Sequence, residues 1–492
     1  MAEINANNVT LVQLLEDYES LKININHFFL IVVSAIIFFM QAGFALLEAG
    51  TVRAKNVTSI LTKNISDMLI GGLTFWLCGY GFAFGTGNGV LGLEHFAAIG
   101  LEKSGYSFLF FQSTFAATCA TIISGAIAER SHFNGYVVFS ALITGVIYPI
   151  QTHWCWGPGG WLGENGYYDF AGSGVVHLAG ATCALVACWI MGPRIGRFTH
   201  GKLRDIPANN IPLVATGFFI LVFGFLAFNG GSQASMNRPG DGESVAMVFY
   251  ATLIACCSGG AIVLIAFRLK TGYWKFGPTV NGALTGVIQE LDLMKNIPRE
   301  VQQQIALCFT GMVSVCCGCD GFYPWSACLA GAVGGLIYIV IAQLVIKLKI
   351  DDPIEAVAVH GGGGAWGLIA GPLLREDGVL SSSASAGTQM LLWNLIGMAC
   401  IIAWNGLTSF VLFGTLHKLG VLRVNEECEL KGLDLFKHDD LAYPEWTPKS
   451  LPGRPLSSES DSSTLVQDMG RLVPKDELLF RTRRKVNQNP GA

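Results

Sequence analysis

Long apolar segments separated by short polar loops occupy the chain from about residue 27 to residue 416. A helix needs about 20 mostly apolar residues to cross the hydrocarbon core of a bilayer. Eleven segments meet this requirement, at 27–49, 65–85, 107–128, 134–154, 174–192, 208–229, 246–268, a split one at 277–318, 322–346, 355–374 and 388–416. The pattern therefore predicts an all-α polytopic membrane protein with eleven transmembrane helices.

Two polar stretches flank this membrane domain, which we place at 27–416. Residues 1–26 carry four acidic side chains and no apolar core, so they do not resemble a signal peptide. Residues 417–492 are polar, with a serine-rich run at 457–463, and we expect a largely disordered, regulatory tail.

The loop charges predict the orientation. With the N-terminus outside, the inside loops hold thirteen Lys and Arg residues and the outside loops hold six. This asymmetry follows the positive-inside rule. Eleven spans then place residues 1–26 outside the cell and the tail at 417–492 in the cytoplasm.

Composition narrows the class of protein further. The 492 residues are 51% hydrophobic and only 13% charged, whereas about 25% is usual for soluble domains. The chain has no basic patch with interleaved aromatics, so we expect no nucleic-acid partner. Most of the 14 cysteines lie in apolar segments. The group Cys316, Cys317 and Cys319 has no nearby histidine, and we expect packing there rather than a metal site. No cofactor is indicated.

Two histidines lie inside segments that otherwise span the membrane, His177 in the fifth and His360 in the tenth. An ionisable group in the bilayer core costs at least ~2.5 kcal/mol, so such residues usually mark a pathway for ions or protons. Asp169 precedes the first histidine by eight residues, and Glu355 precedes the second by five. Five spans is an odd number, so the second half enters the membrane inverted, which predicts a 5+5 pseudo-symmetric arrangement plus one extra helix.

Several independent motifs resemble those of the ammonium transporter (Amt/Mep) family. The stretch from Gln41 to Asn56 is similar to the family's first-span signature, and the stretch from Asp169 to His177 to its main signature. The run from Asp351 to Gly362 resembles the second histidine motif, and Gly432-Leu433-Asp434 the cytoplasmic tail motif. The match runs from about 25 to 445. Glu355 and the tail motif point to the branch shared by plants and invertebrate animals.

The resemblance implies roles for individual residues. His177 and His360 would be paired pore histidines, since a neutral imidazole offers one donor and one acceptor. The alternative is a core histidine bonded to a backbone carbonyl. Trp156 and Ser232 match the outer site that recruits ammonium, although Trp156 could instead be an interfacial belt residue.

Two further pairs have assignments with alternatives. Phe115 and Phe228 match the stacked phenylalanines that close the pore entrance, although phenylalanines at helical spacing are more often simple packing. Asp169 and Glu355 could attract cations. Asp favours helix N-termini, and we favour a structural role for Asp169.

The resemblance implies a homotrimer in the plasma membrane that transports ammonium or methylammonium and is not an enzyme. NH4+ would be recruited outside and deprotonated, and NH3 would pass the two histidines with or without the proton. Two alternatives stay open. One is a non-transporting ammonium sensor on the same scaffold, and the other is a neutral NH3 or CO2 channel of Rhesus type.

The sequence departs from the family pattern in two places. Residues of about 288–309 bring five charges into the eighth span, from Glu290 to Glu300. They either loop out into water or arise from a gene-model error, and the transcript across 280–315 would distinguish the two. In the tail, Phe436 stands where plant members have a regulatory threonine. The serines at 457–463 are either a substitute for that switch or a solvated linker.

Overall fold

The structure is a computed structural model that describes residues 11–199, 202–271, 302–381 and 384–443. The chain divides into two compact units, residues 1–442 and 443–492. The first unit contains the expected membrane domain. Residues 444–492 of the predicted tail, with its serine-rich run, lie outside the described residues, as does the first part of the anomalous stretch near 288–309. The tail's first part, 417–443, is described and contains a helix at Glu426–Lys431 and a π-helical turn at Asp434–His438.

The first half of the membrane domain is helical throughout. Its α-helices are α1 (Leu11–Thr51), α2 (Val57–Thr74), α3 (Tyr80–Phe84), α4 (Tyr106–Ala126), α5 (Phe133–Leu142), α6 (Tyr148–Trp156), α7 (Trp161–Glu164) and α8 (Ala179–Met191). π-Helical turns at Phe75–Gly79 and Ile143–Ile147 join α2 to α3 and α5 to α6, and a third at Ser173–Leu178 begins the helix of α8. Short 3-10 turns lie at Ala54–Asn56, Phe96–Ala98 and Lys103–Gly105.

A small hairpin precedes the second half. Strands β1 (Phe198–Thr199) and β2 (Lys202–Leu203) pair antiparallel, with Phe198 opposite Leu203. The helices that follow are α9 (Ile211–Gly231), α10 (Asp241–Thr271), α12 (Gln302–Val315), α13 (Pro324–Lys347), α14 (Gly363–Leu374), α15 (Ala384–Lys418) and α16 (Glu426–Lys431). π-Helical turns at Val357–Gly362 and Asp434–His438 precede α14 and follow α16.

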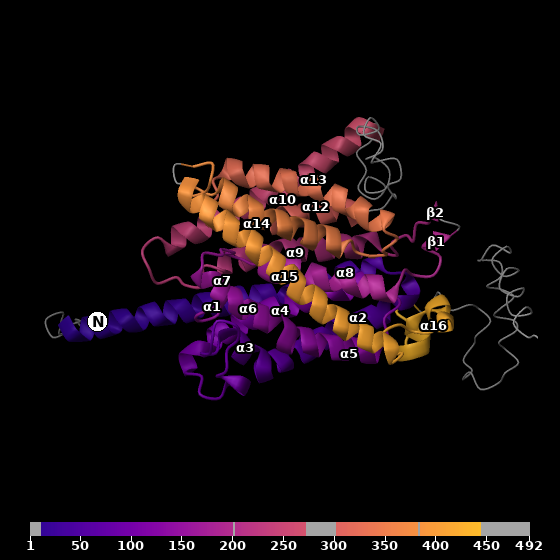
Figure 1. Ribbon diagram of the computed structural model, residues 1–492, viewed down its shortest axis with the longest axis horizontal. Coiled ribbons are helices and arrows are strands. Elements are labelled where there is room, and N and C mark those ends of the chain that lie inside the picture. The colour runs from indigo at the N-terminus through magenta and orange to yellow at the C-terminus, as the bar shows by residue number, and fades with distance from the viewer. Residues whose placement is uncertain (1–10, 200–201, 272–301, 382–383, 444–492) are drawn as a thin grey trace, which may run out of the picture. The chain divides into compact units, whose positions relative to one another are not determined.

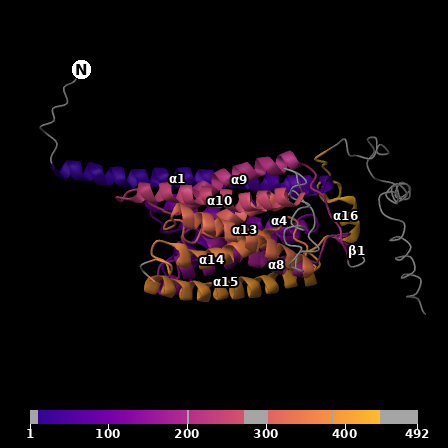
Figure 2. The ribbon, with the colours of Figure 1, turned by 90° about the horizontal axis from the view of Figure 1, so that it is seen from above.

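The predicted fold class is confirmed. In the described part of the chain, ten helical runs are long and apolar enough to cross a membrane. They match ten of the eleven predicted segments. The split segment at 277–318 is described only from Gln302, as α12, which packs against α10, α13 and α14 within the same bundle. Figures 1 and 2 show these long helices lying side by side.

Helix α1 begins earlier than the apolar pattern indicates. It is one continuous helix of 41 residues, so it crosses the boundary expected at residue 26. The reason is local, because no glycine or proline occurs between Leu11 and Ala42 to interrupt it. Sequence hydropathy locates the membrane-spanning part and says little about a polar helical extension.

Close packing of α1 on α9 shapes the centre of the domain. The two helices cross at Gly43 and Gly217, where a Cβ on Gly217 would lie 2.5 Å from the backbone nitrogen of Leu47. Small residues let membrane helices approach closely in this way. The contact brings Leu47 of α1 and Leu221 of α9 to the wall of one cavity.

Candidate functional site

His177 and His360 meet at the centre of the membrane domain. Each lies in a π-helical turn, Ser173–Leu178 and Val357–Gly362, and these turns pack against each other. The two Nδ1 atoms are 3.2 Å apart, and the rings stack with centroids 5.1 Å apart and planes 12° apart. Both side chains are buried. The structure therefore joins two residues that are 183 positions apart in the sequence.

The hydrogen bond between the two Nδ1 atoms determines which of the two Nε2 atoms is a donor and which is an acceptor. A single proton lies between the two Nδ1 atoms, so one ring donates and the other accepts. In neutral rings, the donor's Nε2 is then an acceptor and the other ring's Nε2 carries a proton. Within the described residues, Nε2 of His177 is buried and has no hydrogen-bond partner. The pair can therefore offer a polar atom to a small molecule.

A structural histidine elsewhere in the fold provides a contrast. His153 of α6 is fully buried, and its ring nitrogens lie 2.9 Å from the carbonyl oxygen of Ala83 and 2.8 Å from that of Asn88. Among the described residues, neither His177 nor His360 contacts a backbone carbonyl in this way. The arrangement of the pair disfavours the core-histidine interpretation.

Asp169 holds the turn that carries His177. Its two carboxylate oxygens accept hydrogen bonds from four successive backbone N–H groups, at 3.1, 2.8, 2.8 and 3.0 Å, from Gly172, Ser173, Gly174 and Val175. The hydroxyl of Tyr167 donates a fifth bond at 3.2 Å. This geometry supports the capping role that we favoured, since a carboxylate satisfies the free N–H groups of a helix start.

The corresponding residue in the second half is Asp352, which the sequence analysis did not single out. Its Oδ2 accepts a hydrogen bond of 2.8 Å from the N–H of Val357 at the start of the His360 turn. Glu355, which the sequence predicts as the counterpart of Asp169, makes different contacts. It takes the left-handed conformation, with φ of 60°, and its carboxylate accepts a hydrogen bond from the hydroxyl of Tyr338 in α13. Asp352 is therefore the residue of the second half that corresponds to Asp169. Glu355 instead links the His360 turn to α13 through its hydrogen bond with Tyr338.

Two stacked phenylalanines lie beside the histidines. The rings of Phe115 in α4 and Phe228 in α9 are 4.1 Å apart at their centroids, with planes 21° apart. Phe228 also lies 5.6 Å from His177, centroid to centroid. Both phenylalanines are buried. The structure thus places them together and against the histidine pair.

A second cavity lies on the other side of the phenylalanines and contains the expected recruitment residues. It is lined by Phe84, Phe108, Phe111, Gln112, Phe115, Trp156, Phe170, Ser232 and Ala234. The indole N–H of Trp156 donates a 2.8 Å hydrogen bond to the carbonyl oxygen of Asp169, which fixes the ring, and the Ser232 hydroxyl donates to the carbonyl oxygen of Phe228 at 2.9 Å. We call this cavity the vestibule.

The neighbouring tryptophans behave differently from Trp156. Trp154 donates its N–H to the carbonyl oxygen of Val90 at 2.8 Å and packs against Trp161 and Trp404. It does not line the vestibule, whereas Trp156 does and also contacts Phe115 edge-on at 6.0 Å. The position of Trp156 therefore favours a role at the cavity over a place in an interfacial belt.

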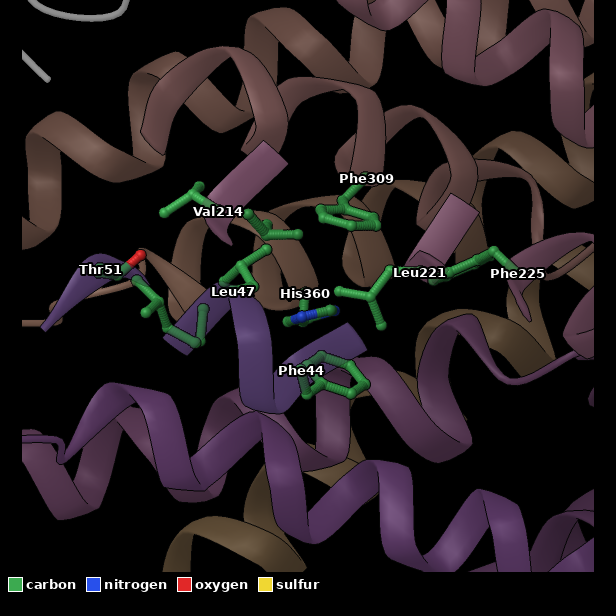
Figure 3. A pocket seen from close by; sticks show the side chains of 11 residues that line it. Phe44, Leu47, Thr51, Val214, Leu221, Phe225, Phe309 and His360 are labelled. Atoms are coloured by element: carbon green, nitrogen blue, oxygen red, sulfur yellow. The ribbon is translucent and has the colours of Figure 1, made fainter. Parts of the chain in front are cut away.

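An apolar cavity lies against the other side of the histidine pair. Its polar lining residues are His360 and Thr51, and Figure 3 shows the imidazole of His360 among Phe44, Leu47, Leu221 and Phe309. The full lining is Phe44, Leu47, Thr51, Val214, Leu221, Phe225, Phe309, Ile354, Ala356, Val359 and His360. We call this the inner cavity.

Phe225 is the most informative residue that the sequence analysis left without a role. Its ring stacks on His177 at 5.4 Å with planes 10° apart, and it also lines the inner cavity. The signal that could have indicated it is its spacing of three from Phe228, which puts both rings on the same face of α9. Phe44 and Phe309 gave no comparable signal, because only the crossing of α1, α9 and α12 brings them to the cavity.

A buried cluster of charges joins loops from both halves. Arg194 donates to Glu129 at 2.5 Å and to Asp351 at 2.8 and 3.0 Å, Arg53 also binds Glu129, and Arg197 lies 3.4 Å from Asp351. Burial alone raises the pKa of Glu129, but Arg194 and Arg53 bring that pKa below its usual value. For Asp351, too, the effect of burial is outweighed by Arg194, which lowers the pKa. Three of the arginines counted in the predicted inside loops, Arg53, Arg194 and Arg197, thus share two buried carboxylates.

The three clustered cysteines face different neighbours. The Cys316 thiol lies 3.2 Å from Oδ1 of Asn229, that of Cys317 lies 3.1 Å from the carbonyl oxygen of Tyr168, and that of Cys319 lies 3.9 Å from the carbonyl oxygen of Cys316. In the described part of the chain, no group of three or more His, Cys, Asp or Glu residues is arranged to hold a metal ion.

The bundle and its site define a multi-span helical membrane protein in which a buried histidine pair and two stacked phenylalanines lie between two cavities. The family model described as Ammonium Transporter Family matches residues 28–289 and 301–443. The chain belongs to the ammonium transporter family. The five charges of the anomalous eighth span lie between the two matched ranges, at 290–300.

Curated relatives and solved structures agree with this assignment. A putative ammonium transporter 1 of Caenorhabditis elegans is 41% identical over 86% of this chain and 79% of its own length. Ammonium transporter 1 member 3 of Solanum lycopersicum is 36% identical over 85% of this chain and 93% of its own. A structure described as a sensor Amt protein is 32% identical, with a TM-score of 0.76 over 85% of this chain and all of its own. Saccharomyces cerevisiae Mep2 shares the fold, with a TM-score of 0.68 at 23% identity over 82% of this chain and 88% of its own.

Proposed function

We propose that this protein conducts ammonium across the membrane. NH4+ gives up a proton at the vestibule, either to water there or to the imidazoles of the histidine pair, and NH3 passes along the pair. The observation that carries the proposal is an unbroken series of ring contacts. Trp156 touches Phe115, Phe115 stacks on Phe228, Phe228 lies against His177, and His177 bonds His360. The series begins at one cavity and ends at the other.

Each part of the series has a chemical task in this proposal. The indole face of Trp156 attracts a cation, which is worth ~0.5–2 kcal/mol depending on its hydration. The Ser232 hydroxyl, already donating to a carbonyl, keeps its lone pairs free to accept from an ammonium N–H. Beyond the phenylalanines the inner cavity is lined by apolar side chains except for Thr51 and His360, so a bare cation would lose most of its hydration without replacement. Losing a proton is the less costly route.

Discrimination against potassium follows from the same physics. K+ has no proton to give up, so it meets the full cost of desolvation in the inner cavity. NH3 can donate to or accept from the outer nitrogens of the imidazoles, one of which is an acceptor and the other a donor. The buried, unpartnered Nε2 of His177 supports this assignment, because it offers a hydrogen bond that the described residues leave unused.

The setting of the protein is part of the same proposal. We place it in the plasma membrane, with residues 1–26 outside, the tail in the cytoplasm and three copies in a homotrimer. The gathering of Arg53, Arg194 and Arg197 around two buried carboxylates supports the predicted cytoplasmic side, because positive loops stay inside.

Uptake of labelled methylammonium in yeast that lacks its own ammonium transporters tests the proposal. We expect saturable uptake by the wild type and its loss, or loss of selectivity over K+, in His177→Ala and His360→Ala. Trp189→Leu serves as a control, since that side chain is largely exposed on α8. Unchanged ammonium-selective transport by both histidine variants would refute the pore assignment.

Two readouts separate the alternatives. A wild-type protein present at the cell surface without any uptake would point to the sensor, whereas the curated relatives are described as transporters. Currents measured together with uptake distinguish the remaining cases. Transport without any current indicates neutral NH3 conduction of Rhesus type, and one charge for each substrate indicates that the proton follows.

A further inference from the structure

The N-terminal end of α1 projects beyond the helices that surround the rest of it (Figures 1 and 2). A helix of 41 residues is about 60 Å long, roughly twice the thickness of the hydrocarbon core. Residues 11–25 are exposed, except for the half-buried Lys22, and we take them as the projecting part. At its base, the side chain of Asn26 accepts a hydrogen bond from the N–H of Met236, and His27 bonds the hydroxyl of Ser107.

Apolar side chains follow the projecting part with alternating spacings of three and four. They are Leu11, Leu14, Tyr18, Leu21, Ile25 and Phe28. The same phase continues into the membrane at Val32, Ala35 and Phe39, so that it extends over four heptads. All nine side chains are exposed. A repeat of 3.5 residues is the pattern of a left-handed coiled coil, with these residues at the a and d positions.

This stripe is free to meet another molecule. In heptad terms, Asn26 and His27 occupy b and c, and both contact the chain's own domain. The b and c positions lie opposite a and d on a helix, so the stripe faces away from the domain that carries it. Leu11, Leu14, Tyr18 and Leu21 have 56–72% of their surfaces exposed.

We propose that Leu11–Phe28 forms a parallel coiled coil with the same segment of other copies of this chain. Copies inserted in one membrane share their orientation, so their N-terminal helices run parallel. Asp17 then occupies g and Lys22 the following e, and in a parallel, in-register pair these positions meet across the interface. Within one chain Lys22 pairs with Glu19 at 3.0 Å, so the contact with Asp17 would replace an exposed ion pair of the same helix. In an antiparallel pair g positions face g positions and e positions face e positions, so Asp17 would not meet Lys22. The charges thus fit a parallel self-assembly.

The contact is independent of the path through the histidines. It joins subunits outside the bilayer, where burying apolar surface is favourable, whereas apolar side chains inside the bilayer gain nothing over lipid. The extension would therefore stabilise the proposed homotrimer without altering the pore. The surface of the bilayer is the other candidate for covering the stripe, and cross-linking combined with lipid quenching distinguishes the two.

Cysteine cross-linking of the full-length chain in membranes tests the proposal. Leu14→Cys and Leu21→Cys put thiols at d positions, and Gln13→Cys and Ser20→Cys put them at the adjacent c positions as matched controls. Residues 11–25 contain no native cysteine, and the unsubstituted chain shows the background from the others. After mild oxidation, we expect covalent dimers on non-reducing gels for the d variants and several-fold fewer for the c variants.

A charge exchange checks the parallel register. In the Leu21→Cys chain, Asp17→Lys places two lysines against each other and should reduce cross-linking several-fold. Adding Lys22→Asp restores an opposite pair and should restore cross-linking. If the helix bound any other partner, adding Lys22→Asp would not restore the cross-linking that Asp17→Lys had reduced.

The contrary outcomes are clear. Absent cross-links at Leu14→Cys and Leu21→Cys, or equal cross-links at d and c positions, would overturn the proposal. Quenching of a fluorophore on Leu21→Cys by nitroxide lipids, without cross-links, would assign the stripe to the bilayer surface. Methylammonium uptake by the same variants is expected to persist, so a failure of this inference is distinguishable from a failure of the proposed function.

Discussion

Asp169 and Asp352 stand in the same relation to the two histidines, each eight residues before its own and each accepting hydrogen bonds from the turn that carries it. The two aspartates are equivalent in position but not in the number of hydrogen bonds that they accept. Asp169 accepts from four backbone N–H groups, as well as from the Tyr167 hydroxyl. The same device thus orients both imidazoles from opposite halves of the chain.

Removing these carboxylates should have unequal effects. Asp169→Ala leaves four buried N–H groups without their acceptor, at about 1–3 kcal/mol for each group that finds no substitute. Asp352→Ala disturbs a smaller set, so we expect a smaller loss of thermal stability in detergent. Asp205→Ala, at an exposed loop position, is the control. Equal losses for the two aspartates would show that the cap of the His177 turn is not specially important.

Opening the phenylalanine stack should reduce selectivity. Phe228→Ala removes the ring that lies between Phe115 and His177 and leaves space that water can enter. We expect a barrier to K+ lower by ~1–2 kcal/mol, which is roughly a tenfold rise in K+ conductance relative to ammonium. Phe219→Ala, on the exposed face of the same helix, is the matched control. The gate assignment fails if the currents of both variants match those of the wild type.

Trp156 should act on apparent affinity. Trp156→Leu removes the aromatic face, worth ~0.5–2 kcal/mol for a cation, so half-maximal uptake should need about 2- to 30-fold more methylammonium. Trp189→Leu should leave this concentration unchanged. A lower maximal rate at constant half-saturation would indicate instead that Trp156 matters mainly for packing.

The buried charge cluster predicts a pH-dependent stability. Arg194→Ala leaves Glu129 and Asp351 buried without their main partner, and breaking such a pair costs about 3–5 kcal/mol at neutral pH. Both carboxylates have lowered pKa values in the folded protein, so the stabilisation is present above their ordinary pKa values near ~4 and is lost as the pH falls below them. The difference in melting temperature between Arg194→Ala and the wild type should therefore narrow below about pH 4.

The control for this prediction is Arg204→Ala. Its side chain is exposed, and its difference from the wild type should be small at every pH. A difference for Arg194→Ala that stays constant down to pH 3 would mean that the cluster contributes through packing and not through its charges.

Much of the architecture could be predicted from the pattern of apolar residues. A span must be apolar for about 20 residues, and this requirement leaves a strong local signal, so ten predicted segments coincide with helices of the right length. The split segment at 277–318 is the exception, and the structure describes only its second part. The start of α1 at Leu11 also differs from expectation, because a polar helical extension has no hydropathy signal.

Some residues of the candidate site could also be predicted from the sequence, whereas others could be assigned only from the structure. His177 and His360 could be found because an ionisable residue in an apolar segment is rare, and the resemblance to the family points to Asp169, Trp156 and Ser232. Asp352 was missed because adjacent acidic residues at 351, 352 and 355 look alike in a sequence. Only the hydrogen bonds show that Asp352 caps the turn, that Asp351 binds Arg194 and that Glu355 binds Tyr338.

By itself, the sequence indicated a helical membrane protein that resembles the ammonium transporter family, with two costly histidines in its interior. Ten of its eleven predicted spans coincide with long apolar helices in the described residues. These properties depend on local composition and motif order, which the linear chain contains. The tertiary structure decided that the two imidazoles share a hydrogen bond, that Phe225 joins them, and which carboxylate has which partner. These facts depend on how helices far apart in the sequence cross, and the packing of α1, α4, α8 and α9 sets those crossings only once the chain has folded.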